Sequence, residues 1–214
     1  MPEQVRFLNP IDSSLQSEHR LLITTRIRDL VPKATRVELP LMGKDEAVAL
    51  LLDLANIEED EYLKEQPGAA WPPQAAYTIA AECGLLPITL TIAAQVVRSW
   101  GDGWQTAVLP LLREQEGAGG QSRTSTAEER VIGAGLQALG KNEDGPAIIE
   151  LFHMFAVTQE DFMHPMAVVE LLWQSCCASE SEKQEGSLTT RLKVRQWTQL
   201  LMDHSLLLLS LIHI

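Results

Sequence analysis

Cysteine, basic side chains and long apolar runs are all scarce in this sequence, and each shortage excludes a class of protein. Its three cysteines, with Cys176 and Cys177 adjacent, match neither a disulfide framework nor the paired spacing of a zinc site, which favours a reducing, intracellular compartment. The 17 Lys and Arg against 29 Asp and Glu leave a formal net charge of −12. We do not expect nucleic acid as a partner, because binding to its phosphates needs clustered basic residues.

No stretch approaches the roughly 20 apolar residues that cross a bilayer, and the N-terminus lacks a basic region before an apolar run. We therefore expect a cytoplasmic protein that does not insert into a membrane.

Motifs for nucleotide hydrolysis, metal binding and nucleophilic catalysis are also missing. The nearest match to the phosphate-binding loop G-x-x-x-x-G-K-[ST] begins at Gly135. Asn142 replaces the hydroxyl that would hold magnesium, and the apolar spacing places the stretch on a helix that Gly140 ends. No apolar strand with acidic residues at its end precedes residue 21, and no Ser-His-Asp or Cys-His arrangement rises above chance. The acidic run 58–61 has no His or Cys beside it, so we predict a solvated loop there. The sequence therefore predicts no catalytic residue and no metal site.

What the sequence does contain is helical periodicity over most of its length. With 214 residues, 45% of them apolar, the chain is long enough to bury a core. Apolar residues at helical spacing predict helices that begin at residue 44 and that cover residues 75–83, 88–100, 104–114, 127–139, 146–155, 165–177 and 191–202. Apolar runs predict strands at 21–25, 36–39 and 206–208, of which the first would be a buried strand of a parallel sheet. The expected fold class is therefore mostly α with a small parallel β remnant.

One stretch, residues 82–90, organises this pattern because it joins two of the predicted helices. Gly84 can adopt the left-handed backbone angles that end a helix, and Pro87 has the fixed φ that suits a first helical turn. Leu85, Leu86 and the ring of Pro87 would then form an exposed apolar face that can pack on a flat aromatic ligand such as a purine. A joint of helix, glycine, proline and helix is also common in proteins without a ligand there, so this stretch by itself leaves both interpretations open.

The order of several motifs resembles the NB-ARC nucleotide-binding module of STAND-class P-loop ATPases, which occurs in apoptosis adaptors, plant immune receptors and other signalling proteins. The matching stretches are residues 20–26 (RLLITTR), residues 37–41 (VELPL) with Glu46, Ala47 and a leucine run behind them, and residues 83–90 (CGLLPITL). Residues 151–157 (LFHMFAV), with the apolar residues up to Trp173, are similar to the start of the family's winged-helix subdomain. The resemblance covers nearly the whole chain.

The resemblance implies a switch that holds ADP in a closed state and exchanges it for ATP to open and form homo-oligomers. In such proteins the arginine that ends the Thr-Thr-Arg strand senses the terminal phosphate, so Arg26, with Thr25 beside it, takes this role. The proline of the Gly-Leu-Pro-Leu motif packs on adenine, so Pro87, with Leu86 beside it, takes that role. A guanidinium at the carboxyl end of a parallel strand offers a charge-assisted fork to phosphate oxygens, although a surface arginine with a carboxylate partner is the alternative. Leu86 and Ile88 depart from the family's motif only in apolar shape.

The phosphate-binding loop and the magnesium-binding strand come earlier in family members, so the resemblance implies a fragment that lacks both. Residues 1–42 would be the C-terminal strands of the nucleotide-binding α/β core, 43–116 a helical subdomain, and 124–208 an incomplete winged-helix-like subdomain after a linker at 117–122. Residues 209–214 (LSLIHI) read as the in-frame translation of a sequencing-library adapter and are expected to lie outside the fold. The parent protein would be a slow ATPase. This chain alone would be inactive, with purine nucleotide bound only together with the missing N-terminal half and magnesium only in the complete protein. The rival hypothesis is a nucleotide-independent helical and winged-helix adaptor that binds other proteins.

Overall fold

The computed structural model describes residues 23–24, 35–114, 125–156, 164–177, 188–207 and 212–213. The chain divides into two units, Met1–Pro40 and Leu41–Ile214. In the first unit, residues 35–40 have no regular secondary structure, and Val37 and Leu39 are 75% and 89% exposed. The strand predicted over residues 36–39 is therefore wrong. A strand needs a neighbour to take up its backbone hydrogen bonds, and no described residue pairs with this segment. Of the predicted strand at 21–25, only residues 23–24 are described, and they form no strand.

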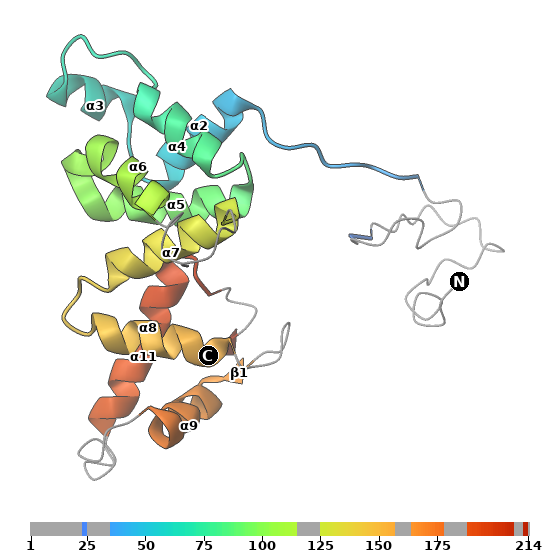
Figure 1. Cartoon of the computed structure of the whole chain (residues 1–214), viewed down its shortest axis with the longest axis vertical. Coiled ribbons are helices and arrows are strands. Elements are labelled where there is room, and N and C mark those ends of the chain that lie inside the picture. The colour runs from blue at the N-terminus through green and yellow to red at the C-terminus, as the bar shows by residue number, and fades with distance from the viewer. Residues whose placement is uncertain are drawn as a thin grey trace. The chain divides into compact units, whose positions relative to one another are not determined.

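The second unit is built almost entirely from α-helices (Figure 1), which confirms the prediction of a mostly α fold. Its described helices are α2 (Lys44–Leu54), α3 (Glu59–Glu65), α4 (Gln74–Glu82), α5 (Pro87–Trp100), the 3₁₀ turn η1 (Gly101–Gly103), α6 (Trp104–Glu114), α7 (Ala127–Leu139), α8 (Gly145–Phe155), α9 (Met166–Cys176) and α11 (Leu188–Asp203). Two short strands, β1 (His164–Pro165) and β2 (Ile212–His213), pair in parallel, and β2 lies within the segment 209–214. Among the described residues, no helix has the length and apolar character needed to cross a membrane.

Helix α3 replaces the solvated loop that was predicted over residues 58–61. Glu58 is the N-cap, and the next three acidic residues form the first helical turn, where negative charge is favoured by the helix dipole. Tyr62 anchors this helix because its side chain is 7% exposed and its hydroxyl donates to Gln66 Oε1 at 3.2 Å. The acidic run was therefore predicted correctly as solvated but wrongly as a loop, because the single buried Tyr62 is enough to anchor this short helix.

The end of α11 also differs from the prediction, because Leu206 and Leu207 form a turn and no strand. Ser205 has a φ of 57°, and the backbone N–H groups of Leu206 and Leu207 both donate to the carbonyl of Leu201, at 2.9 and 3.2 Å. Leu207 is thereby folded back into the hydrophobic core and is 6% exposed. A hydrophobic contact after a helix end explains this arrangement better than an extended strand. Leu208 lies outside the described residues.

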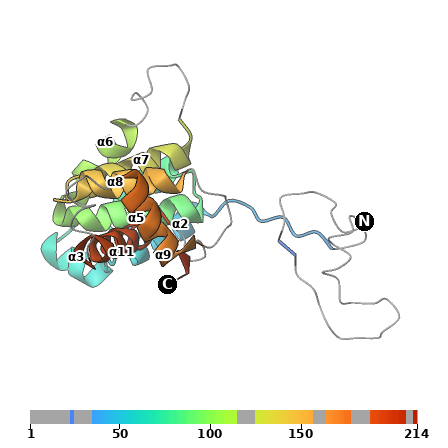
Figure 2. The ribbon, with the colours of Figure 1, turned by 90° about the horizontal axis from the view of Figure 1, so that it is seen from below.

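Two hydrophobic clusters make up the second unit. The first core lies among α2, α4, α5, α6 and the first half of α7, and the second core lies among α8, α9, α11 and the end of α7. Figure 1 shows α7 between α5 and α8, and Figure 2 shows the ribbon turned by 90°, with α8 beside α7. Val131 and Ala134 of α7 are buried in the first core, whereas Leu139 of the same helix is buried in the second. A single helix therefore belongs to both cores.

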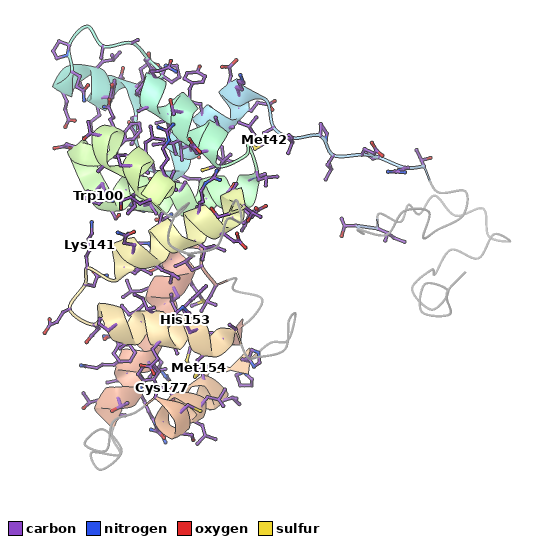
Figure 3. The ribbon with its side chains drawn as sticks, in the orientation of Figure 1. Met42, Trp100, Lys141, His153, Met154 and Cys177 are labelled. Carbon is purple, nitrogen blue, oxygen red and sulfur yellow. The ribbon has the colours of Figure 1, made fainter. Side chains whose placement is uncertain are left out.

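A further contact fastens the loop after α7 to the end of α5. The Lys141 Nζ lies 3.6 Å from the centroid of the Trp100 ring, and Figure 3 shows the two residues near each other. This is the geometry of a cation–π interaction. The near match to a phosphate-binding loop therefore lies on α7 and its end. No described residue before it belongs to a strand, Gly140 is the C-cap of the helix, and the lysine contacts an aromatic ring.

Candidate functional site

The joint between α4 and α5 has the geometry that the sequence predicts. Helix α4 ends at Glu82, Gly84 has a φ of 66°, and Pro87 occupies the first turn of α5. The N–H of Leu85 donates to the carbonyl of Ala80 at 3.2 Å, and the N–H of Gly84 donates to the carbonyl of Ala81 at 2.9 Å. This pair of bonds is the Schellman motif, which satisfies carbonyl groups that a helix end leaves unpaired. The joint is therefore closed by its own backbone.

The side chain of Thr89 holds the joint from the inside, and sequence patterns did not single it out. Its hydroxyl Oγ1 lies 2.6 Å from the carbonyl oxygen of Cys83 and 2.8 Å from that of Leu86, and the residue is 1% exposed. One hydroxyl proton is thus shared between the carbonyl groups on either side of the turn. The only signal in the sequence was a threonine at the third position of the helix, in a first turn that is otherwise apolar.

The exposed face of the joint agrees with the prediction at Pro87 and differs from it at Leu85, whose place is taken by Ile88. Leu85 packs against the first core, and Leu86 is half-buried. Pro87 is exposed, and Ile88 is 47% exposed. The positive φ of Leu85, 57°, turns its side chain back toward the core, which a pattern of residue types cannot reveal. The surface available to a flat ligand is therefore formed by Pro87 and Ile88, with Leu86 at its edge.

Behind the joint, Glu82 connects three helices through its charge. Its Oε1 atom accepts a hydrogen bond from Nε of Arg113 in α6 at 3.0 Å. The Arg130 guanidinium of α7 donates to the Glu82 backbone carbonyl at 2.9 Å and lies 3.3 Å from Oε2. The start of α7 also approaches the turn, because a Cβ atom added at Gly84 would lie 3.6 Å from the Cβ of Ala127. The joint, α6 and α7 are therefore held as one block by the Glu82 network, defined as Glu82, Arg113 and Arg130.

Cys83, the C-cap of α4, has no reactive role in this block. Its side chain is fully buried, and burial raises the pKa of its thiol to about 12, so the group stays protonated near neutral pH. Among the described residues, no group of three or more His, Cys, Asp or Glu side chains is placed to hold a metal ion. The chemistry that the joint offers is therefore apolar contact on a rigid backbone.

The predicted site residues are brought together only in part. Leu86 and Pro87 lie side by side at the start of α5, whereas Thr25 and Arg26 lie outside the described residues. The predicted linker at 117–122 also lies outside them. No family model, no curated protein and no solved structure matches the chain.

Proposed function

We propose that this chain is part of an ADP/ATP-binding signalling switch of the NB-ARC type, in which Pro87 packs on the adenine ring. The observation that carries the proposal is the joint itself. It presents a proline and an isoleucine to solvent at the first turn of α5, and it is held by two backbone bonds and by Thr89. The backbone of the joint does not have to become ordered when a ligand binds. Binding to its apolar surface therefore costs little conformational entropy. The order of the motifs around residues 20–26, 37–41 and 83–90 adds support.

Within this proposal, the remaining parts of the site come from other segments. Arg26, next to Thr25, would form a charge-assisted fork to the terminal phosphate. The helices from α2 to α6 would be the helical subdomain, and α8, α9 and α11 would belong to an incomplete winged-helix-like subdomain. The sequence has no phosphate-binding loop and no acidic residue after a strand to hold magnesium. The chain alone would therefore hydrolyse no ATP and bind ADP poorly, because the groups that stabilise phosphate charge would be supplied by the missing half.

The test compares two prolines at the starts of helices in the complete protein. Pro87→Ala should weaken ADP binding about tenfold, because it removes two methylene groups worth about 0.8 kcal/mol each. Pro146, in the first turn of α8, is also exposed, and Pro146→Ala should leave ADP affinity unchanged. Arg26→Ala should weaken binding more, by about a hundredfold, because a hydrogen-bonded charge pair is lost. Equal ADP affinity in wild type, Pro87→Ala and Arg26→Ala would contradict the proposal.

A second measurement uses the 214-residue chain by itself. Isothermal titration with ADP should show no saturable heat, because the phosphate-binding elements are absent. A micromolar dissociation constant for this chain would mean that it carries a complete nucleotide site of another kind.

A nucleotide-independent adaptor is the second candidate, and the outer faces of α9 and α11 favour it. Leu171 and Leu188 are 62% and 75% exposed, and Val168 and Leu192 on the same two helices are 40% and 50% exposed. Exposed apolar residues on neighbouring helices are typical of surfaces that contact another protein. In that case, signalling by the complete protein would survive Arg26→Ala and Pro87→Ala but would be lost with Leu171→Asp.

A further inference from the structure

An open depression lies beside α2, between that helix, the segment before α4 and Tyr77 of α4. It has a volume of about 470 Å³ and is lined by Asp45, Ala49, Leu52, Asp53, Ile57, Trp71, Pro72 and Tyr77. We call it the Trp71 pocket. The four lining residues of α2 are spaced i, i+4, i+7 and i+8, which places them on one face of that helix. The volume falls within the range of about 300 to 1,000 Å³ that is usual for small-ligand sites.

The apolar wall of the Trp71 pocket is held in place before any ligand binds. The Trp71 ring packs against the first core and contacts the Tyr62 ring, with 5.4 Å between the ring centroids. Tyr62 is itself anchored, because its hydroxyl donates to Gln66 and accepts a hydrogen bond from Gln105 Nε2 at 3.3 Å. Trp71 is nevertheless half-buried rather than covered. A flat aromatic surface is thus left available at a fixed position.

The polar groups of the Trp71 pocket are hydrogen-bond acceptors at its rim. Tyr77 donates its hydroxyl proton to Oδ1 of Asp45 at 3.0 Å, and this bond raises the pKa of Tyr77. Asp53 contributes a second carboxylate. No Lys or Arg lines the pocket, and within the described part of the chain neither aspartate forms an ion pair. Two carboxylates therefore line the same depression as Trp71, and no described basic residue neutralises them.

From this complementarity we propose that the Trp71 pocket binds an arginine side chain presented by a basic segment of a partner protein. A guanidinium is planar and weakly hydrated, so it can stack on the Trp71 ring while its N–H groups donate to the carboxylate of Asp53. A lysine ammonium is a strongly hydrated point charge and would use the ring less well. Ala49 also lines the pocket, and its small side chain takes up little of the pocket's volume. This binding is separate from nucleotide binding and does not depend on the function proposed above.

The test uses the 214-residue chain, labelled with ¹⁵N, and a small probe in place of the partner. Nα-acetyl-arginine amide should shift the indole N–H signal of Trp71 in a saturable way, while those of Trp104 and Trp197 stay in place. The signal is assigned with Trp71→Phe. The neutral analogue Nα-acetyl-citrulline amide has the same planar shape without the charge, and it should bind at least about tenfold more weakly, because a charge-assisted hydrogen bond is lost.

Two variants that each remove one negative charge test whether binding of the arginine probe depends on this pocket or on the net negative charge of the whole chain. Asp53→Asn should weaken binding of the arginine probe about tenfold. Asp102→Asn removes the same charge from exposed η1 and should leave binding unchanged. Asp53 is exposed, and its carboxylate has no hydrogen-bond or ion-pair partner among the described residues, so its replacement should not unfold the protein. The proposal is overturned if the citrulline probe binds as well as arginine, if both variants weaken binding equally, or if the Trp71 signal does not move.

Discussion

The two hydrophobic cores of the second unit are packed by different kinds of side chain. Alanines recur in the first core, where Ala47, Ala76, Ala80, Ala93 and Ala94 are all 1% exposed or less. The buried members of the second core include no alanine, and they are dominated by large residues such as Trp173, Trp197, Met154, Met166 and Met202. Small side chains let helices approach closely and leave no spare volume, whereas rings and flexible methionines fill wider gaps. We therefore expect the first core to be sensitive to added volume and the second to lost volume.

Each of the two cores also has a glutamate that pairs with an arginine of another helix. In the first core, Glu82 joins three helices from the rim. In the second core, Glu170 of α9 is 6% exposed and accepts a hydrogen bond from Arg195 of α11 at 2.6 Å. These charged pairs connect helices that also pack through apolar side chains. We expect the pairs to favour one arrangement of the helices and to add less to stability than the burial of apolar side chains does.

The largest effect is expected from removing volume in the second core. Trp197 packs edge-on against Trp173 with 5.1 Å between the ring centroids, and its Nε1–H donates to Asp144 at 3.0 Å. Trp197→Ala should lower the free energy of unfolding by about 3–5 kcal/mol, as measured by urea denaturation, because it leaves a cavity. The control Trp197→Phe keeps most of the ring and should cost clearly less. Equal losses in the two variants would mean that the hydrogen bond, and not volume, dominates.

Adding volume to the first core should have the next largest effect. Ala94 of α5 is fully buried, so Ala94→Leu should lower the free energy of unfolding by about 1–3 kcal/mol through overpacking. Ala81 on α4 is exposed, and Ala81→Leu serves as the matched control with an expected change near zero. If Ala94→Leu proved neutral, the proposed close packing of the first core would be wrong.

High pH should weaken the first core through Cys83. Burial raises the pKa of its thiol from 9.0 to about 12. In the unfolded chain the thiol ionises near pH 9, while the folded protein keeps the proton, so stability should fall as the pH rises from 9 toward 12. The loss should be about 1 kcal/mol at pH 10. Urea denaturation at pH 8 and pH 10 measures it, and Cys83→Ala should show a smaller difference between the two pH values. Identical pH dependence in the two proteins would count against burial as the cause.

Low pH should weaken the second core slightly through His204. Burial lowers the pKa of this histidine below 6.5, and the adjacent Asp203 opposes the shift in part. The unfolded chain therefore takes up the proton first, and stability should decrease as the pH falls below about 6.5. His204→Gln should lose less stability than wild type between pH 7 and pH 5, as followed by thermal unfolding. This effect should be the smallest of the four because His204 is only half-buried. An equal loss in both proteins would assign the acid sensitivity to other groups.

Most helix positions were predictable from the sequence, and so was the joint at Gly84 and Pro87, whereas α3 was predicted as a loop. Helices α6 and α7 have the bounds that apolar spacing predicts, and the remaining predicted helices differ at their ends by up to three residues. These features depend on residues a few positions apart, so their causes are local. The predicted strand at residues 36–39 failed for the opposite reason, because a strand depends on a partner elsewhere in the chain.

Most of the contacts at the candidate sites that sequence patterns missed join distant residues. The bonds of Thr89 to the carbonyl groups of Cys83 and Leu86 are a local exception. Glu82 and Arg130 are far apart in the chain, and so are Asp45 and Tyr77, yet each pair is in contact. Leu85 was expected on the exposed face of the joint, but its backbone angles direct it toward the core. None of these contacts leaves a periodic trace in the sequence.

The sequence by itself determined where most of the helices lie, and that glycine and proline join α4 to α5, because apolar periodicity, glycine freedom and proline rigidity act within a few residues. Only the tertiary structure decided that Pro87 and Ile88 would be the exposed pair, that α7 would belong to two cores, and that two aspartates would line the same depression as Trp71. The physical reason is that burial and charge pairing are properties of surfaces brought together by folding, and the order of residues along the chain does not specify those surfaces one by one.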